Sequence, residues 1–573
     1  MKKKVIPVLV VLALILIMGI VIVISNLVKK YTPTSERKDL NEYFHIISEE
    51  QPPILVDNTL TDSYSQIING QIYIDFQFLH DHINSRFYWD SNENVLLYTT
   101  ATDVIRAESD SNTYSVSKSS NDFGYTIVKA SADSAWVALD FVKQYSNIAY
   151  EIFENPKRLV IQTDWSEKDI VTTTKNTEIR ERGGIKSLIL SDIEEEQTLY
   201  LLDQGEDWHH VATKDGFVGY VPTKHLSDIT TETPTNDFEE EAFRHITKDK
   251  DICMAWHQVT DYEANRDIAS VLGSTKGVTV ISPTWFALKD NKGNLSDMAS
   301  SDYVNYCHEH NVEVWALVSN LVNYDVDTSS VLTHTSLRQN LINQIVSLAI
   351  QYNLDGINLD FEELDYNEVG DSYIQFVREL SLKLRNNDII FSVDNYVPSK
   401  YTAFYNRKEQ ANFADYIVIM GYDEHYGGSS QEGSVSSLGW VKEAVTNTMA
   451  EVPANQIILG MPFYTRLWTL TPKDTESESE NVEYSVSSEA YGMSGSWNLA
   501  KDHGADITWL EDFGQYYAEY SVGDTFYKIW LEDAKSTECR MKVMDEQNLA
   551  GAAFWKLGLE TGDIWDTIIK YLN

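Results

Sequence analysis

The chain has 573 residues, 43% of them hydrophobic, so it is too long for one ordinary domain and about three or four are expected. Its formal net charge of −42 argues against nucleic acid and anionic lipid as partners, because both are negatively charged. The three cysteines, Cys253, Cys307 and Cys539, are too few and too scattered for a disulfide framework or a metal cluster, and we expect them to be buried apolar side chains. The sequence predicts no cofactor and no metal site.

Residues 1–30 predict a membrane anchor. Three lysines precede an uncharged run at residues 5–28, which as a helix would span about 36 Å, enough to cross a bilayer. The run is longer than the apolar core of a signal peptide, and no small-x-small cleavage site follows it. We therefore expect an uncleaved, single-pass anchor in the cell membrane. We expect the N-terminus to be inside the cell and the rest of the chain outside. Lysines flank the apolar run on both sides, because Lys29 and Lys30 follow it, so the charge difference between the flanks indicates this orientation only weakly. The orientation therefore rests also on the wall-type modules that follow.

Residues 31–52 are polar and charged and predict a tether, and residues 53–165 contain an internal repeat, in which residues 74–99 align with residues 137–162. Each copy predicts a short helix followed by two strands joined by a turn. The matching positions are Phe78 and Phe141, Leu79 and Val142, Asn92 and Asn155, and Leu96 and Leu159. The pattern resembles the α+β repeats at the N-terminus of copper amine oxidases and in bacterial surface proteins. The resemblance implies no copper, and we interpret the region as a spacer or adhesion module.

Residues 168–228 predict short strands. Within them, residues 208–221 predict a β-hairpin, with apolar side chains on both arms and a two-residue turn signal at Asp215 and Gly216. This hairpin resembles the closing hairpin of bacterial Src-homology-3-like domains, which implies a domain that binds cell-wall peptide. A small barrel that only spaces its neighbours is the alternative. An acidic linker, residues 229–249, follows.

Residues 250–573 alternate apolar strand-like runs with helical patterns. The predicted strands are residues 252–259, 278–283, 312–319, 356–361, 389–393, 416–420, 457–461 and 551–555. Eight such strands over about 320 residues predict an α/β fold, a (β/α)8 TIM barrel. The interval 466–549 is too long for a helical crossover, so it predicts a small α+β insertion with strands at 507–510 and 526–532.

The fourth predicted strand carries an unusual polar row. In residues 355–362, with the sequence DGINLDFE, the side chains of Asn358, Asp360 and Glu362 share one face of a strand. The other face is apolar. Two carboxyls and an amide in one short row indicate a catalytic use. Polar or aromatic residues also end the second, fifth, sixth, seventh and eighth strands, and active sites of TIM barrels lie at such strand ends.

The octapeptide resembles the catalytic strand of glycoside hydrolase family 18, whose usual form is DGxDxDxE, with Asn358 in place of the first acid. Residues 420–423, Met-Gly-Tyr-Asp, resemble the family's MxYD motif, and Trp555 stands where the family has a tryptophan below the sugar. Together with residues 529–534, IWLEDA, the octapeptide is most similar to the branch that contains bacterial spore-cortex and cell-wall glucosaminidases.

The resemblance implies a retaining, substrate-assisted mechanism. Glu362 would protonate the glycosidic oxygen, Asp360 would orient the 2-acetamido group that attacks the anomeric carbon, and Tyr422 would donate a hydrogen bond to the acetamido oxygen. We expect Asn358 to donate its amide to Asp360 and to shift the pH profile. The expected substrate-binding residues are Asn358, Met420, Asp423, Trp555, Trp285 and Tyr464.

Such a mechanism requires an N-acetylated glycan, so peptidoglycan is the first expectation and chitin the second. Two alternatives remain. A glycan-binding protein without activity would be expected to lack the acid, but Glu362 is present. A surface adhesion protein would carry its function in residues 53–228, with the barrel vestigial.

Overall fold

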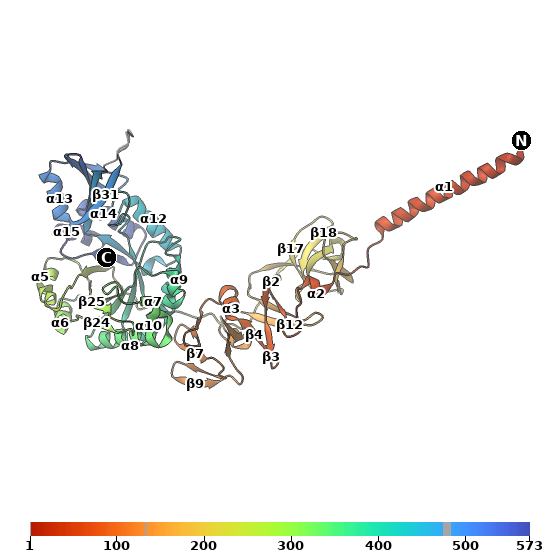
Figure 1. The fold of residues 1–573 in the computed structure, drawn as a ribbon, viewed down its shortest axis with the longest axis horizontal. Helices are drawn as coiled ribbons and strands as arrows, with labels where there is room; N and C mark the ends of the chain where they lie inside the picture. The colour runs from red at the N-terminus through yellow and green to blue at the C-terminus, as the bar shows by residue number, and fades with distance from the viewer. Residues whose placement is uncertain (1, 132–133, 474–482, 573) are drawn as a thin grey trace. The chain divides into compact units, whose positions relative to one another are not determined.

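The computed structural model describes residues 2–131, 134–473 and 483–572 (Figure 1). Two compact units make up the chain. The first comprises Met1–Phe87, Ala107–Thr113 and Asp122–Glu240, and the second comprises Tyr88–Arg106, Tyr114–Asn121 and Glu241–Asn573.

The chain begins with helix α1 (Lys2–Tyr31). Its segment Val5–Tyr31 is, within the described residues, the one helix long and apolar enough to cross a membrane, and none of that segment is buried. Exposed apolar side chains in such a run are costly in water, so the helix needs an apolar environment. Its length and composition suit a membrane anchor or a signal sequence.

The two repeats have the secondary structure that the sequence predicts, each with one further strand in front. The first contains β4 (Gln71–Asp75), α3 (Phe76–His82), β5 (Phe87–Asp90) and β6 (Val95–Thr99), and the second contains β11 (Ala135–Ala138), α4 (Leu139–Lys143), β12 (Ala149–Phe153) and β13 (Arg158–Gln162). The side chain of Asp75 caps α3 by accepting from the backbone of Gln77 and Phe78. Strand β11 pairs with β4, so the leading strands of the two repeats are neighbours.

The next part of the first unit is a seven-stranded antiparallel sheet that contains the predicted hairpin. The hairpin's arms are β18 (Trp208–Ala212) and β19 (Val218–Pro222). They are joined by residues 213–217, a longer connection than the predicted two-residue turn, in which Gly216 has φ +90°. A residue with a side chain would be strained there, which explains the glycine. The sheet contributes Val171, Ile179, Leu190, Leu199, Val211 and Val221 to an apolar core that also includes Phe44 and Leu55 from the preceding part of the chain.

The second unit contains a closed barrel of eight parallel strands, as predicted. The strands are β21 (Ile252–His257), β22 (Val280–Pro283), β25 (Glu313–Ser319), β26 (Gly356–Asp360), β27 (Ile390–Asn395), β28 (Tyr416–Met420), β29 (Ile457–Pro462) and β35 (Gly551–Trp555). Strand β35 pairs with both β21 and β29, and β22 pairs with β25, which closes the cylinder. Nearly every strand residue is buried, because side chains fill the interior and helices cover the outside.

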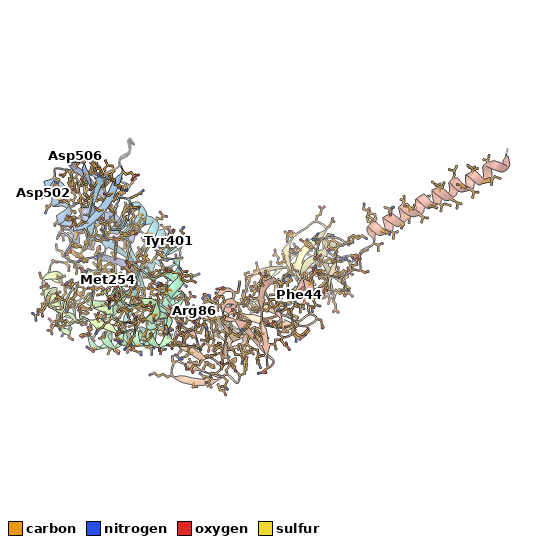
Figure 2. All side chains as sticks on the ribbon, in the orientation of Figure 1. Phe44, Arg86, Met254, Tyr401, Asp502 and Asp506 are labelled. Atoms are coloured by element: carbon orange, nitrogen blue, oxygen red, sulfur yellow. The ribbon has the colours of Figure 1, made fainter. Side chains whose placement is uncertain are left out.

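The barrel has two apolar layers. The inner layer includes Met254, Trp256 and Trp315, all fully buried, with Met254 labelled in Figure 2. The outer layer lies between the strands and the surrounding helices. The principal helices are α5 (Ile268–Gly273), α6 (Ser301–Glu309), α8 (Thr335–Gln351), α10 (Ser372–Arg385), α11 (Arg407–Phe413), α12 (Leu438–Met449), α14 (Ala534–Glu546) and α15 (Ile564–Ile568).

The predicted insertion is a five-stranded antiparallel sheet with one helix, between β29 and α14. Its elements are β30 (Tyr464–Pro472), β31 (Tyr484–Gly492), α13 (Met493–Asp502), β32 (Asp506–Leu510), β33 (Gln515–Val522) and β34 (Thr525–Leu531). The strands predicted at 507–510 and 526–532 are therefore confirmed. Three of its strands, β30, β33 and β34, pack their apolar side chains against α13.

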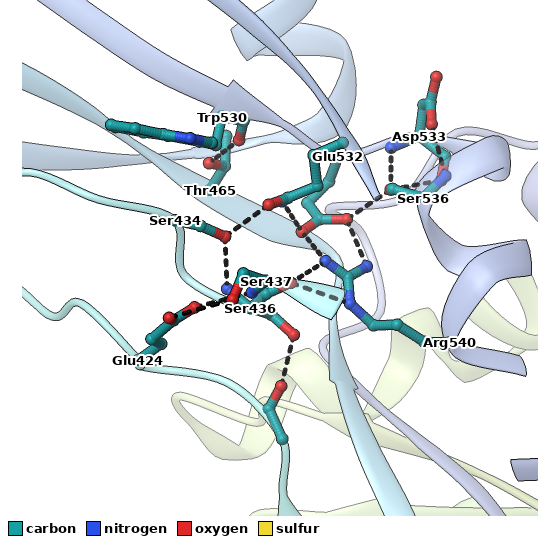
Figure 3. Close-up of polar contacts among 12 residues, drawn as sticks. Glu424, Ser434, Ser436, Ser437, Thr465, Trp530, Glu532, Asp533, Ser536 and Arg540 are labelled. Carbon is teal, nitrogen blue, oxygen red and sulfur yellow. Dashed lines mark hydrogen bonds and ion pairs between the residues drawn. The ribbon is translucent and has the colours of Figure 1, made fainter. Parts of the chain in front are cut away.

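A buried ion pair joins this insertion to the barrel (Figure 3). Glu532, directly after β34, accepts from both terminal nitrogens of Arg540 in α14 at 2.8 Å, and both side chains are at most 1% exposed. Arg540 also donates from Nε to the carbonyl of Ser436, and Ser436 Oγ donates to the carbonyl of Gly421 at 2.5 Å. The pair thereby fixes the segment that directly precedes Tyr422.

Residues upstream of the barrel supply the cap of a barrel helix within the second unit. The N-cap residue of α8, His334, makes no side-chain cap. Instead, Asp90 accepts from the backbone N–H of Thr335 at 2.7 Å and from its hydroxyl at 2.6 Å. One turn later, Arg338 pairs with Glu379 of α10 at 2.9 Å, almost fully buried. The barrel thus depends on a carboxylate far upstream to satisfy the first turn of α8.

Candidate active site

A cavity of about 180 Å³ lies at the carboxyl ends of the barrel strands. Six barrel strands contribute to it, either from their last residues or from the residues just beyond them. Its lining residues are Trp256, Leu317, Asp360, Glu362, Asp394, Tyr396, Met420, Tyr422, Asp423 and Trp555. The structure therefore brings together six of the nine residues predicted for the site.

The backbone of Glu362 is fixed from the neighbouring strand end. Asn320, just after β25, accepts from the N–H of Glu362 through Oδ1 at 2.9 Å and donates through Nδ2 to its carbonyl at 2.9 Å. The following residue, Glu363, has φ +53° and donates its N–H to the hydroxyl of Tyr396 at 3.2 Å. These contacts hold the acid at the point where the chain leaves the strand.

The surroundings of Glu362 favour its protonated form. Burial raises its pKa, and the charges of Asp423 and Glu363 raise it further, whereas a hydrogen bond with Tyr396 acts in the opposite direction. A carboxyl with a raised pKa keeps its proton toward neutral pH, which is what a general acid requires.

Asp360, the last residue of β26, is the second carboxyl of the cavity. Its pKa lies well above the usual value, first because of burial and then because of the charges of Glu362 and Asp394. Within the described chain, its Oδ1 atom is buried and has no hydrogen-bond partner. A buried acceptor of this kind is costly unless it is satisfied, so it is available to an N–H group of a ligand.

Asn358 lies below the cavity, in the barrel interior. Its Nδ2 donates to Ser392 Oγ at 3.0 Å and to Asp394 Oδ1 at 2.7 Å. Its Oδ1 accepts from Trp256 Nε1 at 2.9 Å and from Ser282 Oγ at 3.2 Å. The amide is fully buried and makes all four of its hydrogen bonds with the protein.

The expectation that Asn358 donates to Asp360 is therefore wrong. Residues i and i+2 of a strand share a face but are about 6.5–7 Å apart along it, whereas the next strand is only about 4.8 Å away. The short amide consequently reaches across to β27. Asn358 does not line the cavity. It is therefore not placed to contact a substrate, contrary to the expectation from the sequence.

The residues after β28 form one wall. Tyr422 lines the cavity, and burial together with the charges of Asp394 and Asp360 keeps its pKa well above that of a free phenol. It therefore remains a hydrogen-bond donor. Asp423 adopts φ +60° and accepts from the hydroxyl of Tyr464 at 2.5 Å. Tyr464, expected to bind substrate, does not line the cavity and instead orients Asp423.

Two tryptophans, Trp256 and Trp555, line the cavity. Trp555, at the end of β35, is partly exposed and lines the cavity. Its ring meets that of Trp256 edge-on, with centroids 5.8 Å apart, and Trp256 in turn meets Tyr422 at 6.4 Å. The partly exposed ring of Trp555, supported from its edge by Trp256, is the aromatic face on which the apolar face of a sugar ring can rest.

Trp285 does not belong to the site, contrary to the sequence-based expectation. It is fully buried in the outer layer of the barrel, where its Nε1 donates to Asn265 Oδ1 at 2.8 Å and its ring meets Tyr303 edge-on. The residue follows β22, but the chain there turns its side chain toward the helices. Trp285 supports the barrel rather than a ligand.

Leu317 and four polar or aromatic residues of the site escaped prediction. Asp394 and Tyr396 were visible only as the polar end of the fifth strand, and Trp256 and Asn320 stand at the ends of the first and third. Strand-end position was thus the available signal for all four. Among the described residues, no group of three or more His, Cys, Asp or Glu side chains is arranged to hold a metal ion.

Comparison with known proteins gives a consistent result. The model of Glycosyl hydrolases family 18 matches residues 253–560, more than half of the chain.

Individual relatives agree with this match. The chain is 26% identical over 326 residues to "Uncharacterized glycosylase YvbX" of Bacillus subtilis (strain 168), covering 53% of this chain and 88% of that protein. It is 24% identical over 254 residues to the cortical fragment-lytic enzyme of Bacillus anthracis, covering 43% and 57% respectively. Chitinase A1 of Niallia circulans is 24% identical over 273 residues, covering 40% and 38%. The chain thus spans less than two thirds of the last two relatives.

Proposed function

Because the chain belongs to family 18 of the glycosyl hydrolases, we propose that this glycosidase cleaves β-1,4 bonds next to N-acetylglucosamine in peptidoglycan, with retention of configuration. The observation that carries the proposal is the pairing of two carboxyls in one cavity: Glu362 with a raised pKa, and Asp360 with an unpartnered buried oxygen. One can give a proton, and the other can accept an amide N–H.

The proposed reaction uses the substrate's acetamido group as the nucleophile. Glu362 and Asp360 come from one strand and reach the sugar from one side, so neither stands opposite the leaving group. Glu362 protonates the glycosidic oxygen as the bond to the anomeric carbon breaks, and the acetamido oxygen bonds to that carbon. Asp360 Oδ1 accepts the acetamido N–H and stabilises the positive charge of the resulting oxazolinium ring. Glu362 then takes a proton from the water that opens the ring.

Replacing Tyr422 with Phe is expected to lower kcat by about 100-fold, because the variant loses the phenol that donates to the acetamido oxygen in the proposed reaction. The ring remains, so the melting temperature should not change. Steady-state kinetics on N-acetylglucosamine oligosaccharides measure the effect. Tyr426→Phe is the matched control, since Tyr426 is 56% exposed, follows the same strand and keeps in the variant the ring that could stack on a sugar. Equal activity of the two variants would exclude Tyr422 from the reaction.

Peptidoglycan is favoured over chitin by the likeness to the cortical fragment-lytic enzyme and by the chain's other parts. In this proposal, α1 is a single-pass anchor with its N-terminus inside the cell, and the barrel acts outside. Residues 168–228 act as an SH3-like domain that binds wall peptide, and residues 53–165 act as a spacer. The likeness to chitinase A1 keeps chitin as the second candidate.

Exposed tyrosines at the catalytic end support a polymeric substrate. Tyr324, Tyr366, Tyr401 and Tyr426 follow β25, β26, β27 and β28 in turn, and they are between 52% and 81% exposed. Tyr401 is labelled in Figure 2. Loops after the strands of a TIM barrel meet at one end, so these rings flank the cavity's end of the barrel and are available to stack on further sugars.

The test is digestion of purified peptidoglycan by the full chain in detergent, followed by mass spectrometry of the new reducing ends. New N-acetylglucosamine ends are expected, and new N-acetylmuramic acid ends would contradict the proposed bond. Parallel incubation with chitin oligosaccharides tests the second candidate: faster cleavage of chitin than of peptidoglycan would favour it.

A further inference from the structure

A third carboxyl stands beside the two that the proposed reaction uses. Asp394, in β27, lines the same cavity and is only 3% exposed. In the register of β26 and β27, Asn358 pairs with Ser392 and Leu359 with Val393. Continuing that register by one residue places Asp394 beside Asp360, on the inward face of the adjacent strand.

Asn358 fixes the orientation of this third carboxyl. Its Oδ1 is committed to two donors, Trp256 Nε1 and Ser282 Oγ, so the amide cannot turn over without losing both hydrogen bonds. Its Nδ2 must therefore face β27, where it donates to Asp394 Oδ1 at 2.7 Å. The amide thus holds Oδ1 of Asp394 as an acceptor and fixes the orientation of the carboxyl.

We propose that Asp394 is the positioning residue for Asp360: the chain carries on β27 the carboxyl that the family's motif has at position 358, and Asn358 holds it there. The inference rests on one part of the proposed function, namely that ionised Asp360 stabilises the acetamido group of the substrate. Asp394 acts through Asp360 and does not itself touch the substrate.

The electrostatics of the site agree with this geometry. After burial and the charge of Glu362, the charge of Asp394 raises the pKa of Asp360. The pKa of Asp394 itself is also raised, by burial and by Glu362, although the hydrogen bond from Asn358 opposes the shift. The other titratable or charged groups around the pair are Glu363, Tyr373, Tyr396, Tyr405, Arg407, Tyr422, Asp423, Tyr464 and Arg466.

Three variants of the full chain test the proposal: Asp394→Asn, Asn358→Asp, and the two together. Removing a negative charge lowers the pKa of Asp360, so Asp394→Asn should move the acid limb of kcat/KM about one unit toward lower pH. Asn358→Asp adds a carboxyl and should move the limb about one unit toward higher pH. The double variant restores one acid and one amide in contact, so its limb should return to that of the original chain.

A purely structural role would give a different pattern. If Asp394→Asn and the double variant lost activity equally at every pH, with no movement of the limb, the proposal would be overturned. Asn358→Asp keeps the Asp394 carboxyl in the chain and provides a separate test if the variants that lack it fold poorly. An unmoved limb in that variant would equally count against the proposal.

A binding measurement separates this inference from the proposed function. In a Glu362→Gln background, calorimetric titration with the N-acetylglucosamine trisaccharide follows the ionisation of Asp360 without turnover. The same shifts are expected in the pH dependence of Kd. If peptidoglycan were not cleaved but these shifts appeared, only the choice of polymer would fail. If cleavage occurred without them, only the role of Asp394 would fail.

Discussion

Glu362→Gln is expected to lower kcat on any N-acetylated glycan by about 10²- to 10⁴-fold, the range that loss of a general acid and base produces. Glutamine has the same shape but no proton to transfer at the glycosidic oxygen. Asn320 contacts only the backbone of residue 362, so the substitution leaves its position unchanged. The residual activity should also lose its dependence on pH along the alkaline limb, because that limb follows the ionisation of Glu362.

Glu363→Gln is the matched control, since Glu363 is the adjacent residue and its side chain is exposed. It should retain activity within about twofold, with a small movement of the alkaline limb toward lower pH, because its charge contributes to the raised pKa of Glu362. Substrate turnover and melting temperature are measured on both variants. If Glu362→Gln kept a tenth of the activity or more, the acid would have to be sought elsewhere.

Glu532→Gln is expected to lower the free energy of unfolding of the barrel by about 3–5 kcal/mol. The substitution leaves the guanidinium of Arg540 buried without an opposite charge, and such a group cannot recover its hydration. Activity should fall as well, because Arg540 holds Ser436, and Ser436 holds the carbonyl that precedes Tyr422. Urea unfolding followed by tryptophan fluorescence measures the loss.

The control for this pair lies on the same helix. Lys542 and Glu538 form an exposed i,i+4 pair at 3.9 Å in α14, and Lys542→Gln should change stability by about 0.5 kcal/mol or less. A loss from Glu532→Gln no greater than that from the control would mean that the insertion is not held to the barrel through this ion pair.

The barrel could be predicted because its strands are buried on both faces, which makes each one a continuous apolar run in the sequence. The position of Asp360, Glu362, Tyr422 and Trp555 at strand ends then placed them at one end of the barrel. Their convergence on one cavity is what the structure describes. These four residues could be predicted because their positions follow from the barrel topology, and the order of strands and helices in the sequence indicates that topology.

What escaped prediction depends on contacts between strands. The partner of Asn358 follows from the register of β26 against β27, and no local pattern in either strand encodes that register. For the same reason Asp394 could be noted as a strand-end residue but not as the partner of Asn358. Trp285 and Tyr464 also follow barrel strands, yet the chain bends after each strand and directs one ring into the outer layer and the other to Asp423.

The contact between Asp90 and Thr335 has a consequence for how such chains evolve. A recombination event that joined residues 253–560 to a different leader would leave the first turn of α8 without its cap, at a cost of about 1 kcal/mol. It would also uncover Arg338, whose guanidinium lies 5.0 Å from the ring centre of Tyr88. Strand β5, which carries both Tyr88 and Asp90, therefore contributes to the stability of the barrel and would have to accompany it to keep that stability.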